Sequence, residues 1–174
     1  MFPRAKITRA VKVFSCIAMI FIVVIALCKI YGPSFNFQVT DSRPKGIYRI
    51  EPVQNIGRGD IVVLKVPKRI LSYCESRRMI PRNLKYVLMK NVIALPGDII
   101  KVSRAGCYVN GIYYGPVFAL DSVGKPLPTC YGEYILKEKQ YFLANKYEKS
   151  LDSRYFGPVL KEEITGKAKP WLVF

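Results

Sequence analysis

The feature that most limits the fold is an uncharged apolar stretch near the N-terminus. Val13–Cys28 carries no charge, and Lys12 and Lys29 bound it. The stretch is a little shorter than the ~20 apolar residues that usually cross a membrane. Both lysines, however, can extend their side chains toward the membrane surface, which lengthens the effective span to Val11–Ile30. The pattern therefore predicts a single membrane-spanning helix ahead of whatever else the chain forms.

This anchor would divide the chain into a cytoplasmic basic segment, residues 1–12, a transmembrane anchor, residues 13–30, and an extracytoplasmic domain, residues 31–174. The positive charges of the first segment favour the cytoplasm for the N-terminus. A cleavable signal peptide is the competing interpretation. No small-x-small cleavage site follows the apolar stretch, since Lys29-Ile30-Tyr31-Gly32-Pro33 comes next. A retained anchor is therefore favoured.

The domain after the anchor is predicted to be mostly β. The chain is 51% hydrophobic, Gly and Pro occur throughout, and no long amphipathic period stands out. Asn110-Gly111 between apolar pairs indicates a two-residue hairpin. The runs Pro67–Leu84 and Gly115–Gly132 are expected to be surface loops. The predicted strands are Gly46–Glu51, Asp60–Val66, Tyr86–Leu95, Ile99–Ser103, Tyr108–Val109, Ile112–Tyr113, Tyr134–Ile135 and Gln140–Ala144.

Histidine is absent from the sequence, and this limits the chemistry. A Ser-His-Asp triad and a Cys-His pair are both excluded, and the commonest zinc ligand is missing. The five cysteines form no CxxC pair, so no metal and no cofactor is expected. If the protein hydrolyses a bond at neutral pH, another side chain must accept the proton.

The formal net charge of +16 indicates an anionic partner. Nucleic acid is one candidate, and an anionic membrane surface is another. The basic residues are spread along the chain and form no block interleaved with aromatic residues. Together with the predicted anchor, this spread favours membrane lipid as a partner and argues against nucleic acid.

Two lysines are candidate general bases. Lys90 is the only charge within Tyr86–Leu95, where both alternating faces are apolar, so burial is expected to lower the pKa of its amine. Lys65 within Ile61–Val66 fits the same argument nearly as well, and the local sequence does not separate the two. For either lysine the plainer interpretation is an edge-strand residue whose amine reaches solvent.

Ser42 is the candidate nucleophile that a free lysine amine could activate. It lies just before a predicted strand, where Pro44 and Gly46 favour a bent backbone that can present a side chain at the edge of a cleft. The plainer interpretation of Ser42 is an ordinary turn serine.

Four blocks in order resemble the TraF-type conjugative transfer signal peptidases, which are relatives of the type I signal peptidases. The resemblance covers about residues 36–165, and its last two blocks are the most specific. The blocks are Thr40-x-Ser42-x-Pro44-x-Gly46-x-Tyr48, Arg58-Gly59-Asp60-Ile61-Val62-Val63, Lys90-Asn91-Val92-Ile93-Ala94-Leu95-Pro96-Gly97-Asp98 and Ser150-x-Asp152-Ser153-Arg154-Tyr155-Phe156-Gly157-Pro158-Val159.

The resemblance implies roles for individual residues. Ser42 matches the nucleophile and Lys90 matches the general base, which decides against Lys65. Thr40 matches a position whose hydroxyl helps the backbone N–H of Ser42 to form the oxyanion hole.

Asp152 matches an acid that is functionally important in the family, and Asp152 and Arg154 are expected to support and orient groups near Lys90. A structural ion pair is the alternative interpretation of these two residues. The resemblance also implies a signal-peptidase-like coiled β-sheet domain preceded by a single N-terminal transmembrane helix. The catalytic domain would lie on the periplasmic side of a bacterial inner membrane.

The implied activity is that of a membrane-anchored serine endopeptidase with a Ser/Lys dyad. Its substrate would be a membrane-inserted precursor, typically a conjugative prepilin whose cut product can be cyclised, and conjugative type IV secretion components would be partners. Arg43 and Asn91 depart from the housekeeping pattern and favour the conjugative branch. The alternatives are a housekeeping type I signal peptidase, an inactive membrane-tethered secretion-channel assembly factor and a self-cleaving LexA-like regulator.

Two further expectations concern the domain. Cys107 and Cys130 flank a loop in an oxidising compartment, which predicts a disulfide between them. The segment Phe35–Val39 alternates apolar and polar residues, and Trp171–Phe174 forms a second apolar patch, so both are expected near the membrane surface. Packing of the first stripe in the core is the alternative.

Overall fold

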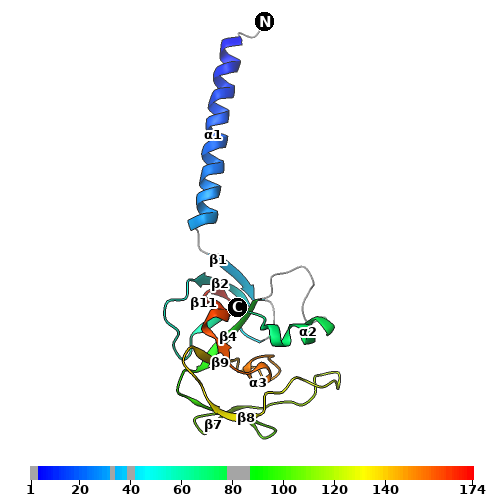
Figure 1. The fold of residues 1–174 in the computed structure, drawn as a ribbon. Helices are drawn as coiled ribbons and strands as arrows, with labels where there is room; N and C mark the ends of the chain where they lie inside the picture. Colours follow the sequence, from blue (N-terminus) through cyan, green and yellow to red (C-terminus); the bar gives the residue numbers. More distant parts are fainter. Residues whose placement is uncertain (1–3, 32–33, 39–41, 78–86) are drawn as a thin grey trace. The chain divides into compact units, whose positions relative to one another are not determined.

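The computed structural model describes residues 4–31, 34–38, 42–77 and 87–174, and within the first helix it describes the side chains of residues 11–25. The chain forms two compact units, Met1–Ser34 and Phe35–Phe174 (Figure 1). The first unit is a helix, and the second is built mostly from β-strands.

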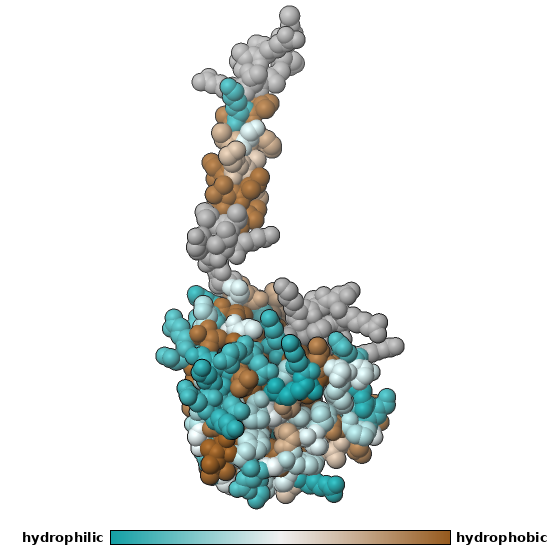
Figure 2. All heavy atoms as spheres, in the orientation of Figure 1, coloured by the Kyte–Doolittle hydropathy of each residue, from teal (hydrophilic) through white to brown (hydrophobic). Residues whose placement is uncertain are grey.

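Helix α1 (Arg4–Tyr31) makes up the first unit, and neither Gly nor Pro interrupts it. Its described side chains from Val11 to Ile25 are mostly apolar and exposed, and they include the brown stretch in Figure 2. In the part of the chain that the structure describes, no helix combines the length and the apolar character needed to cross a membrane. The anchor predicted over residues 13–30 is therefore helical but is not confirmed as a membrane span.

Eleven strands form two sheets in the part of the chain that the structure describes. In the large sheet the neighbours from β2 to β10 pair antiparallel, and the small sheet is antiparallel throughout. In spatial order the large sheet is β1 (Ser34–Gln38), β2 (Gly46–Glu51), β11 (Ile164–Val173), β3 (Ile61–Lys65), β4 (Val87–Ala94), β9 (Gln140–Ala144) and β10 (Val159–Leu160), and the small sheet is β7 (Ile112–Gly115), β6 (Gly106–Val109), β5 (Ile99–Ser103) and β8 (Gly132–Ile135).

Three clusters of buried apolar residues stabilise the second unit. One packs α2 (Lys68–Ser76) against the large sheet through Ile70. Another joins the two sheets, and Phe142 of β9 and Ile100 of β5 are both fully buried in it. Strand β4 supplies residues to all three clusters, namely Met89, Val92 and Ile93. Because β4 is packed on both faces, a side chain on it has little freedom to move.

The predicted mostly β fold is confirmed, and β2, β5 and β9 have the predicted bounds. Several other elements were not predicted, and α2 and β11 are the longest of them. Pro67–Leu84 was expected to be a surface loop but contains α2, whose Ile70 and Cys74 lie one helical turn apart and pack on the sheet. Strand β11 was not predicted, yet it lies between β2 and β3 within the large sheet. Its hydrogen-bond partners come from far away in the sequence.

The predicted disulfide between Cys107 and Cys130 is wrong, because both residues are free thiols. Cys107 is fully buried in β6, and burial raises the pKa of its thiol to about 12. The Sγ of Cys130 instead donates to the carbonyl oxygens of Ser153 and Arg154, over 3.3 and 3.1 Å. Each thiol therefore has its own surroundings, which the spacing of the cysteines in the sequence does not reveal.

Candidate functional site

Lys90 lies within the large sheet and is almost fully buried. It pairs with Val62 of β3 and is 4% exposed. Burial lowers the pKa of its amine to about 8; Asp152 opposes this decrease, whereas Arg154 and Arg43 add to it. Because burial disfavours the ammonium form, the free amine is available at a lower pH than in an exposed lysine. Lys90 is therefore suited to act as a base.

Lys65 was the competing candidate for the base. It is the last residue of β3 and is exposed, whereas the three residues before it are buried. An exposed amine keeps its hydration, whereas the amine of Lys90 is buried. The structure therefore separates the two lysines, which the local sequence does not.

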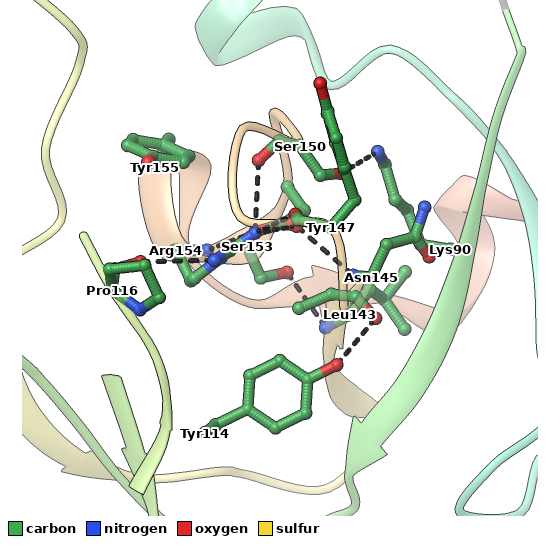
Figure 3. Close-up of polar contacts among 12 residues, drawn as sticks. Lys90, Tyr114, Pro116, Leu143, Asn145, Tyr147, Ser150, Ser153, Arg154 and Tyr155 are labelled. Carbon is green, nitrogen blue, oxygen red and sulfur yellow. Dashed lines mark hydrogen bonds and ion pairs between the residues drawn. The ribbon is translucent and has the colours of Figure 1, made fainter. Parts of the chain in front are cut away.

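Ser150 is a partner of Lys90 that the sequence analysis did not assign. The Nζ of Lys90 donates to the Oγ of Ser150 over 2.6 Å, and both residues are buried (Figure 3). The two residues are 60 positions apart in the sequence. Ser150 begins the last of the four sequence blocks, which is the signal that could have identified it. This hydrogen bond fixes the direction of the amine.

Asp152 and Arg154 form a buried ion pair in the same region. The Nε and Nη2 of Arg154 donate to the two carboxylate oxygens of Asp152 over 2.8 and 2.9 Å. Asp152 also caps α3 (Ser153–Phe156) by accepting from the backbone N–H of Arg154. Burial by itself lowers the pKa of Arg154, but the hydrogen bonds and charge of Asp152 outweigh burial and raise it.

The guanidinium of Arg154 also joins several loops. It donates to the carbonyl oxygens of Pro116, Tyr147 and Ser150 (Figure 3). The ion pair therefore has a structural role, as the alternative interpretation expected. It also acts on the base, because the charges of Asp152 and Arg154 both change the pKa of Lys90.

Ser42 is half-buried in a turn ahead of β2. The next residue, Arg43, donates from Nη2 to the Oδ1 of Asn91 over 2.8 Å and to the Oδ1 of Asn145 over 3.1 Å. Asn91 directly follows Lys90 on β4. The turn that contains Ser42 is therefore linked to β4 one residue after the candidate base.

Three of the five predicted site residues, Lys90, Asp152 and Arg154, lie close enough for their charges to interact. Ser42 is linked to this group through its neighbour in the sequence, and Thr40 lies outside the described residues. The Ser42–Lys90 dyad and its oxyanion hole remain predictions. Within the described part of the chain, no group of three His, Cys, Asp or Glu residues could hold a metal ion.

Two of the sequence blocks meet at a structural junction. The Nη2 of Arg58 donates to the Oδ2 of Asp98 over 2.7 Å, and the same carboxylate accepts from the backbone N–H of Leu95 over 2.6 Å. The side chain of Arg58 is 48% exposed, and exposed ion pairs contribute at most about 1 kcal/mol. These contacts shape the turn between β4 and β5.

A cavity of about 530 Å³ opens beside Asn91, between β4 and the β6–β7 hairpin. Ile112 and Tyr113 of the hairpin give it apolar walls, and the exposed Arg58 and Lys146 add positive charge. Apolar clefts of this size with a few polar groups are typical binding sites. The cavity shares Asn91 with the contacts of Arg43.

Comparison with known proteins adds independent observations. Residues 6–172 match the family described as "Signal peptidase, peptidase S26". The chain is 29% identical over 165 residues to the conjugal transfer protein TraF of Agrobacterium tumefaciens (strain 15955), which covers 90% of this chain and 92% of that protein. It is 30% identical over 112 residues to a probable signal peptidase I-2 of Synechocystis sp. (strain ATCC 27184 / PCC 6803 / Kazusa), over 64% of this chain and 45% of that protein.

Among solved structures, a signal peptidase I from Enterococcus faecalis V583 aligns with 21% identity and a TM-score of 0.39, over 66% of this chain and 97% of that one. The family match runs from α1 to β11 and includes all four sequence blocks. The similarity to TraF proteins that the blocks predicted is confirmed. The chain belongs to the signal peptidase family, peptidase S26.

Proposed function

We propose that the protein is a serine endopeptidase in which Lys90 activates Ser42. One observation carries the proposal: Lys90 is buried within the sheet, and burial lowers the pKa of its amine to about 8. A serine protease without histidine needs a base of this kind. Membership of the signal peptidase family supports a peptidase. The hydrogen bond from Arg43 to Asn91 supports the approach of Ser42 to Lys90.

In the proposed reaction, the Oγ of Ser42 attacks the carbonyl carbon of the scissile peptide bond, and the Nζ of Lys90 accepts the hydroxyl proton. The carbon–nitrogen bond then breaks, and the proton passes from Lys90 to the leaving amine. Water attacks the resulting ester with Lys90 again as the base, which releases the carboxylate and restores Ser42. If an amine of the substrate replaces this water, the product is cyclic.

The remaining polar groups would support this reaction. The backbone N–H of Ser42 and the hydroxyl of Thr40 are the proposed donors to the oxyanion, and one such donor typically contributes about 3 kcal/mol to the stability of the transition state. Ser150 would hold the amine of Lys90 in a fixed direction through its 2.6 Å hydrogen bond.

The experiment that tests the proposal uses the full chain in detergent with a candidate pilin precursor, followed by mass spectrometry of the products. We expect cleavage by the natural protein and by Lys65→Met, and none by Ser42→Ala or Lys90→Met. Because the two residues would act as one unit, the double variant should be no worse than either single variant. Cleavage that survives Ser42→Ala would falsify the proposal.

A conjugative precursor is the substrate that the relatives favour. The TraF protein of Agrobacterium tumefaciens aligns over 92% of its length, whereas the probable signal peptidase I-2 aligns over 45%. Cells that lack the protein should therefore accumulate one precursor. Accumulation of many different precursors would indicate a housekeeping signal peptidase instead.

Action at the periplasmic face of the inner membrane is the corresponding proposal for location, with α1 as the attachment. The exposed apolar side chains of β1 and of the C-terminus support it: Phe37 is 69% exposed, Trp171 63% and Phe174 86%. The rings of Phe35 and Trp171 lie 5.2 Å apart between centroids. Exposed apolar patches with aromatic rings are typical of surfaces that contact a membrane.

A further inference from the structure

Arg43 links three segments of the domain. It directly follows Ser42, and one of its nitrogens, Nη2, donates to both Asn91 and Asn145. The hydrogen bond to Asn91 spans 48 positions of the sequence and the one to Asn145 spans 102. A single nitrogen therefore links the turn of Ser42, the strand of Lys90 and the segment after β9.

Asn145 is held so that its oxygen faces Arg43. Its side chain is 1% exposed, and its Nδ2 donates to the carbonyl oxygen of Met89 over 3.2 Å. This leaves Oδ1 free to accept from the backbone N–H of Asn91 over 3.2 Å and from the guanidinium. The backbone N–H of Asn145 donates to Asp152 over 3.2 Å. The acceptor for Arg43 is therefore fixed by both β4 and the buried ion pair.

The placement of this guanidinium reduces the stability of the fold. Its Nε is buried and has no hydrogen-bond partner among the residues that the structure describes, and an unsatisfied buried donor typically destabilises a fold. The guanidinium lies over the ring of Tyr48 at 5.9 Å, and the Tyr48 hydroxyl donates to the carbonyl oxygen of Pro44 over 2.9 Å. No salt bridge of Arg43 occurs among residues 42–77 and 87–174 or elsewhere in the described chain. A cation that is kept without a carboxylate in this position suggests a functional reason.

We infer that Arg43 is a positioning residue for the reaction, because its guanidinium holds the turn of Ser42 against the strand of Lys90 through Asn91 and Asn145. The inference rests on the proposed function. Two separable effects follow from it. The hydrogen bonds set the distance between nucleophile and base, and the positive charge of Arg43, which forms no salt bridge with a described residue, disfavours a second positive charge on Lys90.

The second effect, a lower pKa of Lys90, can be assigned to Arg43 by considering each charged group around Lys90. Asp152 and Arg154 act on Lys90 from the segment around α3, and Arg43 acts from the turn before β2. On the neighbouring strands, Val62 pairs with Lys90 and Ala144 pairs with Asn91, and neither carries a charge. Since Asp152 and Arg154 form an ion pair with each other, loss of Arg43 removes a positive charge that no described carboxylate pairs with. The pKa of Lys90 should then rise.

The test measures acylation of Ser42 by p-nitrophenyl acetate in the full chain in detergent, as a function of pH. The Oγ of Ser42 attacks the ester carbonyl, Lys90 takes the proton and p-nitrophenolate leaves, so release of the coloured product gives the rate. Peptide mapping by mass spectrometry counts the acetyl groups on Ser42 alone. The pH at which the rate is half-maximal reports the pKa of the base.

For Arg43→Met we expect a rate at least about 10- to 100-fold lower, which is the size of effect that small misplacements of reacting groups produce. The half-maximal pH should also move upward, which a merely structural role would not cause. Arg43→Lys should lose rate but keep the half-maximal pH, because the charge stays and the planar group is lost. Asn91→Leu should also lose rate and keep the half-maximal pH, because it removes an acceptor of the hydrogen bond but keeps the charge of Arg43.

The matched control is Arg49→Met, which removes an exposed arginine of β2 and should change neither quantity. If Arg43→Met does not fold, as judged by circular dichroism, the rates of Arg43→Lys and Asn91→Leu still test whether the guanidinium and its acceptor position Ser42. Wild-type rates and half-maximal pH in all three variants would overturn this inference alone. Absence of acetylated Ser42 in the wild-type protein would overturn the proposed function as well, so the two failures can be told apart.

Discussion

At the scale of single residues, the lowered pKa of Lys90 predicts a pH dependence of stability. The folded chain releases this proton at about pH 8, below the ordinary value of 10.5. Between these two pH values the unfolded chain binds more protons at this site, so the contribution of Lys90 to the free energy of unfolding should rise with pH, by the order of 3 kcal/mol. Denaturant unfolding at pH 7.5 and 10.5 measures this contribution as the difference between the natural protein and Lys90→Met, in which the opposing effect of buried thiols such as Cys107 cancels. Lys65→Met should behave like the natural protein. An equal rise in all three proteins would mean that the amine of Lys90 is not desolvated.

Ser150 offers a second prediction at this scale. Ser150→Ala removes the 2.6 Å hydrogen bond to the Nζ of Lys90, so the amine loses its fixed direction and cleavage per folded molecule should fall about 10- to 100-fold. Ser153→Ala is the matched control. The Ser153 hydroxyl accepts from the backbone N–H of Leu143 over 3.0 Å, so its loss should cost about 1–3 kcal/mol of stability and little of the rate. Similar rates for the two variants would argue against a role of Ser150 in the reaction.

At the scale of elements, the junction of β2 and β11 decides how the turn of Ser42 enters the sheet. Gly46 has a φ of +147°, and a Cβ on it would meet the backbone oxygen of Leu172 and the Cα of Val173, the latter at 2.7 Å. Gly46→Ala should therefore force the two strands apart and destabilise the fold by more than about 1 kcal/mol. Urea denaturation measures the loss.

Gly111 is the control for this prediction. It also has a positive φ, +79°, but a Cβ on it would meet no atom within 4 Å. Gly111→Ala should therefore show the cost of backbone strain alone, about 1 kcal/mol. If Gly46→Ala were no worse than Gly111→Ala, the close approach of β2 and β11 would not constrain the turn.

At the scale of the whole molecule, the exposed apolar patch of β1 and the C-terminus predicts membrane binding that does not depend on α1. Residues 31–174 contain all three core clusters and should fold without the first unit. They should float with anionic lipid vesicles, and Phe37→Ser combined with Trp171→Ser should abolish flotation, because both side chains are more than 60% exposed. The control is Ile112→Ser, which removes a side chain that is 74% exposed on the small sheet. Flotation that is unaffected by the double variant would contradict the proposed membrane contact.

Much of this molecule follows from its sequence. The strands β2, β5 and β9 could be predicted with their bounds, because each is a short run of β-branched and aromatic residues between turn signals. The elements that were missed depend on distant partners. Strand β11 contains Gly166, Pro170 and two lysines, a pattern that does not indicate a strand. It becomes one because β2 and β3 supply its hydrogen bonds.

The sequence by itself predicted a Ser/Lys dyad, because a serine protease without histidine needs another base and the sequence blocks contain Ser42 and Lys90. Only the tertiary structure decided that Lys90 is buried while Lys65 is exposed, and that Ser150, Asn91 and Asn145 surround the site. The physical reason is distance along the chain. Burial and hydrogen bonds between residues 48 to 102 positions apart arise only when the sheet is assembled, and local patterns carry no record of them.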